Sequence, residues 1–356
     1  MLQLPPLSLY IHIPWCVQKC PYCDFNSHAL KQNVPETDYV AALLADLDAD
    51  LGYVQNRQLQ SIFIGGGTPS LFSANAIKDL LQGVAARIPF ASDIEITLEA
   101  NPGTVEAGRF AGYQQAGVTR ISIGVQSFQP EKLQKLGRIH DPQQAVAAGL
   151  QAKQAGLRSF NIDLMHGLPE QSISDALYDL KQAIEIALPH LSWYQLTIEP
   201  NTAFGSRPPV LPEDETLWDI QEQGHQLLLE AGYRQYEISA YAKPGFECRH
   251  NLNYWQFGDY LGIGCGAHGK ITLPQENRII RTAKVKHPKG YLDPERAFLD
   301  QSWDVENDDR PFEYFMNRMR LFQPVPKAEF TFRTGLTAES VEPMFAKAYE
   351  QGLLQQ

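Results

Sequence analysis

Short apolar runs recur along the chain, and most of them are rich in β-branched or aromatic residues. Six are typical of buried strands, at 8–13, 61–66, 94–100, 120–126, 160–165 and 193–198. Between them, apolar residues recur at helical spacing in 39–54, 74–87, 105–116, 142–155 and 174–187, with a further short helix at 131–136. This alternation of strands and helices predicts a parallel sheet with right-handed crossovers.

Six such units predict an α/β fold built on a partial TIM-like barrel, (β/α)6, that is open on one side. A full eight-stranded barrel is the alternative, but the sequence shows no clear seventh and eighth units. We expect a barrel core in residues 1–200, a segment that completes the barrel in 201–290, and a smaller C-terminal α(+β) domain, mostly helical, in 291–356. In such barrels the chemistry lies at the C-terminal ends of the strands.

Two helices are predicted in the C-terminal region, at 310–322 and 337–352. The first carries a stripe of Arg, Met and Phe, which we expect to lie in a core and not around a cofactor.

Composition narrows the class of protein. The net charge is −11, which disfavours nucleic-acid binding, because such proteins usually carry a basic surface. There is no apolar stretch of about 20 residues, so we expect no transmembrane segment, although peripheral membrane contact stays open. Residues 1–9 lack the features of a signal peptide. Five cysteines, three of them clustered, indicate a reducing compartment, so we expect a cytoplasmic protein.

The clustered cysteines are Cys16, Cys20 and Cys23, in the spacing C-x3-C-x2-C just after the first predicted strand. Three thiolates on one loop can each bind one iron of a cubane cluster and leave the fourth iron open to a small molecule. Zinc is the alternative, but zinc loops favour paired C-x2-C units, and no second pair is present. We expect Cys248 and Cys265 to be buried as small apolar residues.

Polar residues follow several of the predicted strands. Residues 65–69 have the sequence Gly-Gly-Gly-Thr-Pro, in which glycine lets the backbone approach a ligand, although a tight turn explains the same residues. Glu99, Gln126 and Asp163 lie at or near the ends of the next three strands, and Arg138 follows soon after the second of them. Such residues are expected to surround one polar ligand, with carboxylates suited to hydroxyl groups and Arg138 suited to a carboxylate.

A second group of residues, HNLNYW at 250–255, has the pattern HNxxYW. Its imidazole could ligate heme iron, and its aromatic side chains could cover a flat apolar macrocycle. A purely structural loop is an equal alternative on the residues alone. We expect the segment to form a loop over the open side of the barrel, close to the cysteines.

The cysteine loop and the segments GGGTPS, RISIGVQSF, LGRIHD and NIDLMHGLPEQ together resemble the radical S-adenosylmethionine (SAM) superfamily. From residue 7 to about 269, the chain is similar to the family that contains oxygen-independent coproporphyrinogen III oxidase and heme chaperones. The resemblance implies a [4Fe–4S] cluster on the three cysteines, with SAM on the open iron as the source of a 5′-deoxyadenosyl radical. The SAM contacts that it implies are Tyr10, Tyr22, Gly67, Thr68, Glu99, Gln126, Arg138, Asp163 and Thr197.

Three features favour the heme-chaperone branch of this family. The oxidase has a fourth cysteine where this chain has Phe25, and it carries an N-terminal extension for which there is no room before Cys16. HNxxYW resembles the chaperone branch and implies heme contact by His250, Tyr254 and Trp255. The implied function is therefore binding of heme and its transfer to acceptor hemoproteins, such as respiratory ones. Oxygen-independent coproporphyrinogen III oxidase stays the alternative, while the acidic net charge disfavours a tRNA-modifying enzyme.

Overall fold

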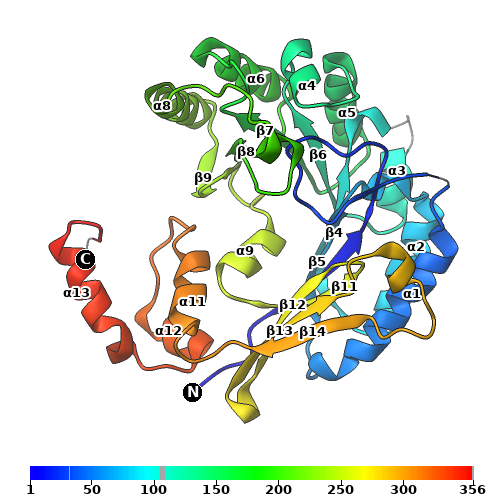
Figure 1. The fold of residues 1–356 in the computed structure, drawn as a ribbon, viewed down its shortest axis with the longest axis vertical. Coiled ribbons are helices and arrows are strands. Elements are labelled where there is room, and N and C mark those ends of the chain that lie inside the picture. The colour runs from blue at the N-terminus through cyan, green and yellow to red at the C-terminus, as the bar shows by residue number, and fades with distance from the viewer. Residues whose placement is uncertain (32, 105–108, 355–356) are drawn as a thin grey trace.

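The computed structural model describes residues 1–31, 33–104 and 109–354 (Figure 1). Within them, one curved sheet of twelve strands has the order β14-β13-β12-β11-β1-β4-β5-β6-β7-β8-β10-β9. The strands from β11 to β8 in this order are parallel to one another. Helices lie on the outer side of the parallel strands (Figure 1). The predicted partial barrel is confirmed.

The six predicted strands are β1 (Leu7–Ile13), β4 (Leu59–Gly66), β5 (Phe90–Ala100), β6 (Arg120–Gln126), β7 (Ser159–His166) and β8 (His190–Gln195). The last of these ends before Leu196, so the predicted strand at 193–198 was too long at its C-terminal end. The helices between them are α1 (Glu36–Asp50), α2 (Ala74–Ala85), α3 (Arg109–Gln115), α4 (Pro130–Lys135), α5 (Pro142–Gln154) and α6 (Ile173–Ile186). The first part of the helix predicted at 105–116 lies outside the described residues.

Alternation along the strands separates an outer apolar face from an inner polar one. In β1, Leu9 and Ile11 are fully buried in the main hydrophobic core, which also includes residues of α1 and α2. Ser8 and His12 alternate with them and therefore face the inside of the barrel.

The starts of two helices are fixed by capping side chains, because Asp141 and Ser172 form capping boxes at the start of α5 and α6.

A seventh parallel strand, β11 (Asp259–Gly264), pairs with β1, and sequence analysis missed it. Its glycines hid its strand character, although Gly262 is needed there, since a Cβ at this position would lie 1.9 Å from the carbonyl oxygen of His268. Strands β12 (His268–Leu273), β13 (Arg278–Lys284) and β14 (Leu299–Asp304) extend this edge in antiparallel fashion. At the other edge lie β10 (Ala240–Ala242) and β9 (Arg234–Glu237).

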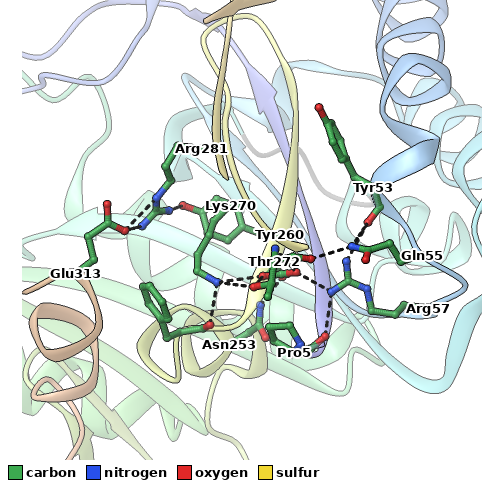
Figure 2. Close-up of polar contacts among 12 residues, drawn as sticks. Pro5, Tyr53, Gln55, Arg57, Asn253, Tyr260, Lys270, Thr272, Arg281 and Glu313 are labelled. Carbon is green, nitrogen blue, oxygen red and sulfur yellow. Dashed lines mark hydrogen bonds and ion pairs between the residues drawn. The ribbon is translucent and has the colours of Figure 1, made fainter. Parts of the chain in front are cut away.

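The start of β11 is fixed by a buried charge cluster, shown in Figure 2. Asp259 forms ion pairs with Arg57 (2.8 Å) and Lys270 (3.0 Å), and it accepts hydrogen bonds from the backbone and side chain of Thr272. Burial lowers the pKa of Lys270 to about 8. Because a buried charge is stable only when it is paired, this cluster fixes how β11 and β12 meet.

The remaining elements are the long helix α8 (Asp214–Glu230) and the short β2 (Trp15–Cys16), β3 (His28–Ala29), α7 (Ala203–Ser206), α9 (Arg249–Trp255) and α10 (Pro288–Tyr291). In the described part of the chain, no helix is long and apolar enough to cross a lipid bilayer.

Three helices follow the sheet: α11 (Arg310–Arg318), α12 (Lys327–Thr334) and α13 (Glu342–Glu350). Their core contains Tyr314, Phe330 and Leu2, so both ends of the chain contribute to it. The sequence did not predict α12, and it placed the domain boundary at 291, whereas β14 continues the sheet to Asp304. The expectation of a buried Arg, Met and Phe stripe was wrong for Phe312, which is 71% exposed, and for Met316, which is also exposed.

Candidate functional site

A cavity of about 430 Å³ lies at the C-terminal ends of the parallel strands. The structure brings nearly all of the predicted cluster and SAM residues to its wall: Cys16, Cys20, Tyr22, Cys23, Gly67, Thr68, Glu99, Gln126, Arg138, Asp163 and Thr197. Tyr10 is the exception. It lies deeper, with its hydroxyl oxygen 2.9 Å from Nδ1 of His12.

The cysteine loop is closed at its base by two short strands, because β2 pairs with β3. Asn26, just after the loop, donates to the carbonyl oxygens of Cys265 and Lys286, at 2.9 Å each. The turn after β11 therefore packs against the cysteine loop. Burial raises the pKa of the Cys16 and Cys23 thiols, although a hydrogen bond with Ser27 opposes this for both.

The donor set suits a cubane cluster, because three thiols lie on one loop at the cavity and a cubane takes each thiolate on a different iron. Among the described residues, no group of three His, Cys, Asp or Glu side chains is placed to hold a single metal ion. Arg138 donates to the Cys20 sulfur at 3.5 Å, so a fixed positive charge lies beside the thiols.

The glycine-rich turn after β4 is tied to the segment that leads into the cysteine loop. The Gly67 N–H donates to the carbonyl of Ile13, and the Thr68 N–H donates to the carbonyl of Trp15, both at 2.7 Å. A Cβ at Gly67 would lie 2.4 Å from the Trp15 oxygen, so only glycine allows this approach. Since these N–H groups are used inside the protein, the turn can offer a ligand its carbonyl groups.

Two half-buried carboxylates, Glu99 and Asp163, lie at the inner wall of the cavity. Glu99 accepts from the Gly66 N–H at 3.1 Å, while Asp163 accepts from Ser122 at 3.0 Å and from Asn161 at 2.7 Å. Burial, and then the charge of Asp163, raises the pKa of Glu99 to about 8. Burial also raises the pKa of Asp163. Both carboxylates would be stabilised by a ligand that donates hydrogen bonds or carries positive charge.

Gln126 reaches the cavity through a backbone irregularity at the end of β6. The pairing of β6 with β7 shifts register between Gly124 and Gln126, and Gln126 has a φ of 70°. A bulge of this kind redirects a side chain at the end of a strand. The Gln126 amide oxygen accepts from the Tyr194 hydroxyl at 2.7 Å. Thr197 lies beyond the end of β8 and donates to Glu199 at 2.9 Å.

Sequence analysis missed two residues of this wall, Ser122 and Tyr194, which hold Asp163 and Gln126 in place. The alternation of residues along the two strands could have indicated both. Each occupies the alternate, inward-facing position of its strand, where a polar residue interrupts an apolar run.

HNxxYW forms helix α9 and not a loop, and it lies at the end of the barrel opposite the cysteine loop. The expected position over the open side, near the cysteines, was therefore wrong. His250 is fully buried against the N-terminal part of β4, with Nδ1 2.9 Å from the Ser61 hydroxyl and Nε2 2.9 Å from the Tyr254 hydroxyl. Its backbone N–H donates to Glu95 at 3.1 Å. Burial lowers the pKa of His250 to about 3, so the ring is neutral.

Tyr254 and Trp255 line a separate pocket of about 210 Å³ between the barrel and α11. Arg281 lies at this pocket, where it donates to Tyr260 at 2.9 Å and pairs with Glu313 of α11 at 2.5 Å (Figure 2). The Arg320 guanidinium stacks over the Trp255 ring at 4.3 Å. The motif thus lies where the barrel meets the C-terminal helices.

The two cysteines outside the loop, Cys248 and Cys265, are fully buried, as predicted.

A partial barrel with a three-cysteine loop at the C-terminal ends of its strands defines the class of radical SAM proteins, and the Radical SAM superfamily model matches residues 10–181. The HemN C-terminal domain model matches residues 305–356. The chain is 65% identical over 354 residues to "Heme chaperone HemW" of Escherichia coli, which covers 99% of this chain and 93% of that protein. It is 62% identical to the protein of the same name from Haemophilus influenzae, again over 99% and 93%. The chain belongs to the HemW family.

Among solved structures, the chain is similar to coproporphyrinogen III oxidase (HemN) from Escherichia coli. The TM-score is 0.79 at 22% identity, over 97% of this chain and 84% of that one. At this identity the likeness concerns the fold alone.

Proposed function

We propose that the protein is a cytoplasmic heme chaperone. It carries a [4Fe–4S] cluster on Cys16, Cys20 and Cys23, binds SAM in the neighbouring cavity, binds heme, and transfers heme to an acceptor hemoprotein such as a respiratory one. The observation that supports the cluster and SAM most directly is the set of three thiols on one loop, at a cavity whose wall includes the half-buried carboxylates of Glu99 and Asp163. The heme part rests on family membership and on HNxxYW.

Each wall of the cavity suits a different part of SAM. Arg138 is placed to pair with a carboxylate, and the carbonyl of Gly67 is placed to accept from an amino group. Glu99 and Asp163 can accept from ribose hydroxyls, which would provide the hydrogen-bond donors that these buried oxygens favour. When bound, the cluster would supply the electron for any cleavage of SAM.

For heme, we propose contact through Tyr254 and Trp255, with His250 holding Tyr254 in position. The pocket beside the two aromatic residues is smaller than the roughly 300 Å³ at which pockets for drug-sized ligands begin, so it would take an edge of the macrocycle only. An edge-bound heme stays accessible, as transfer requires. Ligation of iron by His250 would require α9 to leave the barrel, because both ring nitrogens already have hydrogen-bond partners.

The experiment titrates hemin into the cluster-loaded protein under anaerobic conditions and follows the Soret band. We expect about one heme per chain, with affinity at least fivefold weaker in Trp255→Leu. Trp218→Leu is the matched control, since Trp218 is 71% exposed on α8. Equal affinities in both variants and the wild type would place heme elsewhere, with His268 and Cys248 tested next.

The same preparation, supplied with coproporphyrinogen III, SAM and a reductant, tests the alternative. We expect no protoporphyrinogen IX, because Phe25 stands where the oxidase has its fourth cysteine, and Phe25 is 60% exposed at the cavity rim. Formation of the decarboxylated product would replace the chaperone proposal with the oxidase.

A further inference from the structure

A third pocket, of about 260 Å³, lies at the N-terminal ends of β5, β6 and β7, opposite the cysteine loop. Arg120 and Ser159 line it from the first residues of β6 and β7. Arg249 and Leu252 of α9 form another side. Neither the predicted SAM site nor the predicted heme contacts include any of these residues.

Arg120 is the unusual feature of this pocket. The residue is 3% exposed, and the Nε of its guanidinium has no hydrogen-bond partner among the described residues, although the nearby charges of Glu95 and Asp163, against the effect of burial, raise its pKa. The Ser159 hydroxyl, in a residue that is 8% exposed, likewise has no partner in the described part of the chain. A buried charge costs several kcal/mol, which a protein usually offsets with hydrogen bonds as well as with nearby opposite charge.

The neighbouring acidic groups are engaged elsewhere. Glu95 accepts through Oε1 from the His250 N–H at 3.1 Å and from the Cys248 thiol at 3.6 Å. Asp93 pairs with Arg249 at 2.6 Å, and its carbonyl oxygen accepts from Arg158 at 3.3 Å. Arg158 and Arg249 therefore add positive charge around the pocket, while the Nε of Arg249 has no partner among the described residues. Glu95 and Glu247 both line the pocket and are the acidic groups that an anionic ligand would have to avoid.

We propose that this pocket binds a small oxyanion, with a phosphate or carboxylate group held between the Arg120 guanidinium and the Ser159 hydroxyl. A planar guanidinium presents paired N–H donors that match two oxygens of such a group, and a hydroxyl can donate to a third acceptor position. The volume accommodates a group of this size together with water. Two sources of the oxyanion are considered, free phosphate and a carboxylate side chain of heme. Only the second source rests on the proposed function.

The experiment compares the melting temperature of the cluster-loaded wild type in phosphate and in chloride at matched ionic strength. We expect a saturable rise in phosphate for the wild type and none for Arg120→Gln. In chloride alone, Arg120→Gln removes a buried charge together with its attraction to Glu95 and Asp163, so the rise caused by phosphate, and not the melting temperature in chloride, is the readout. Ser159→Ala should fold normally and weaken phosphate binding several-fold. Arg207→Gln, an exposed change outside the pocket, is the control.

A second arm titrates hemin into the wild type and Arg120→Gln, with and without saturating phosphate. Weaker hemin binding by Arg120→Gln, together with competition by phosphate, would identify the heme carboxylate as the source. Phosphate stabilisation lost in Arg120→Gln without any change in hemin binding would identify a free anion. Equal phosphate response in the wild type and Arg120→Gln, with equal hemin affinity, would overturn the proposal.

Discussion

The two ends of the barrel use similar polar residues in opposite ways. At the C-terminal ends of the strands, Glu99, Asp163 and Arg138 line an open cavity, and their charged groups face space that a ligand can occupy. At the N-terminal ends, the two ring nitrogens of His250 form hydrogen bonds with Ser61 and Tyr254, so they are not free to bind a ligand. Inward-facing polar residues therefore do not by themselves mark a binding site. What distinguishes the cavity from the group of Ser61, His250 and Tyr254 is whether the hydrogen-bonding capacity of the residues is already used.

This difference predicts that changes at the cavity end remove ligands, whereas changes at the α9 end weaken the fold. The largest effect is expected for replacing Cys16, Cys20 and Cys23 together with Ala. Anaerobically reconstituted protein should fall from about four irons per chain to almost none. Iron analysis and the absorption spectrum measure this, and Cys248→Ala is the control because Cys248 is buried away from the loop. Retention of four irons in the triple variant would refute the ligand assignment.

A smaller effect, now on stability, is expected for His250→Ala. The change removes two buried side-chain hydrogen bonds and leaves the Tyr254 hydroxyl without its partner, while Ser61 keeps its bond to Ser8, so the free energy of unfolding should drop by about 2–4 kcal/mol. Glu99→Gln is the matched comparison at the cavity end. It keeps the shape and a bond to the Gly66 N–H while removing a buried carboxyl group, so it should change stability by less than about 1 kcal/mol. Urea unfolding measures both, and equal losses would contradict the distinction between the two ends.

The smallest effect is expected for the pH dependence of the contribution that His250 makes to the free energy of unfolding. The pKa of His250 is about 3 in the folded protein and about 6.5 when unfolded, so acid favours the unfolded state by protonating it. The stability advantage of the wild type over His250→Ala should be complete above about pH 6.5. It should shrink by about 1.4 kcal/mol per pH unit below that value. A constant difference between pH 7 and pH 5 would show that folding leaves the pKa of His250 unchanged.

The residues of the cavity could be predicted because two independent signals coincide there. Strand periodicity places residues such as Glu99 at strand ends, and parallel strands bring those ends together. The cysteine spacing then identifies the chemistry. At the opposite end, HNxxYW offered no such combination, since seven residues of α9 are too few to show a helical period. Strand β11 was missed for a related reason, because its glycines lack the side chains on which periodicity depends.

The pairing of β1 with β11 has a consequence for the order in which the molecule forms during synthesis. The two strands are about 250 residues apart in the chain, and Leu2 packs against helices that are made later still. At ordinary translation rates of about 5–20 residues per second, the first strand waits tens of seconds for its neighbour. During that time one edge of β1 has unpaired backbone groups, which are prone to wrong pairing. Conditions that slow translation should therefore raise the burden on cellular folding factors for this chain more than for one whose edge strands form last.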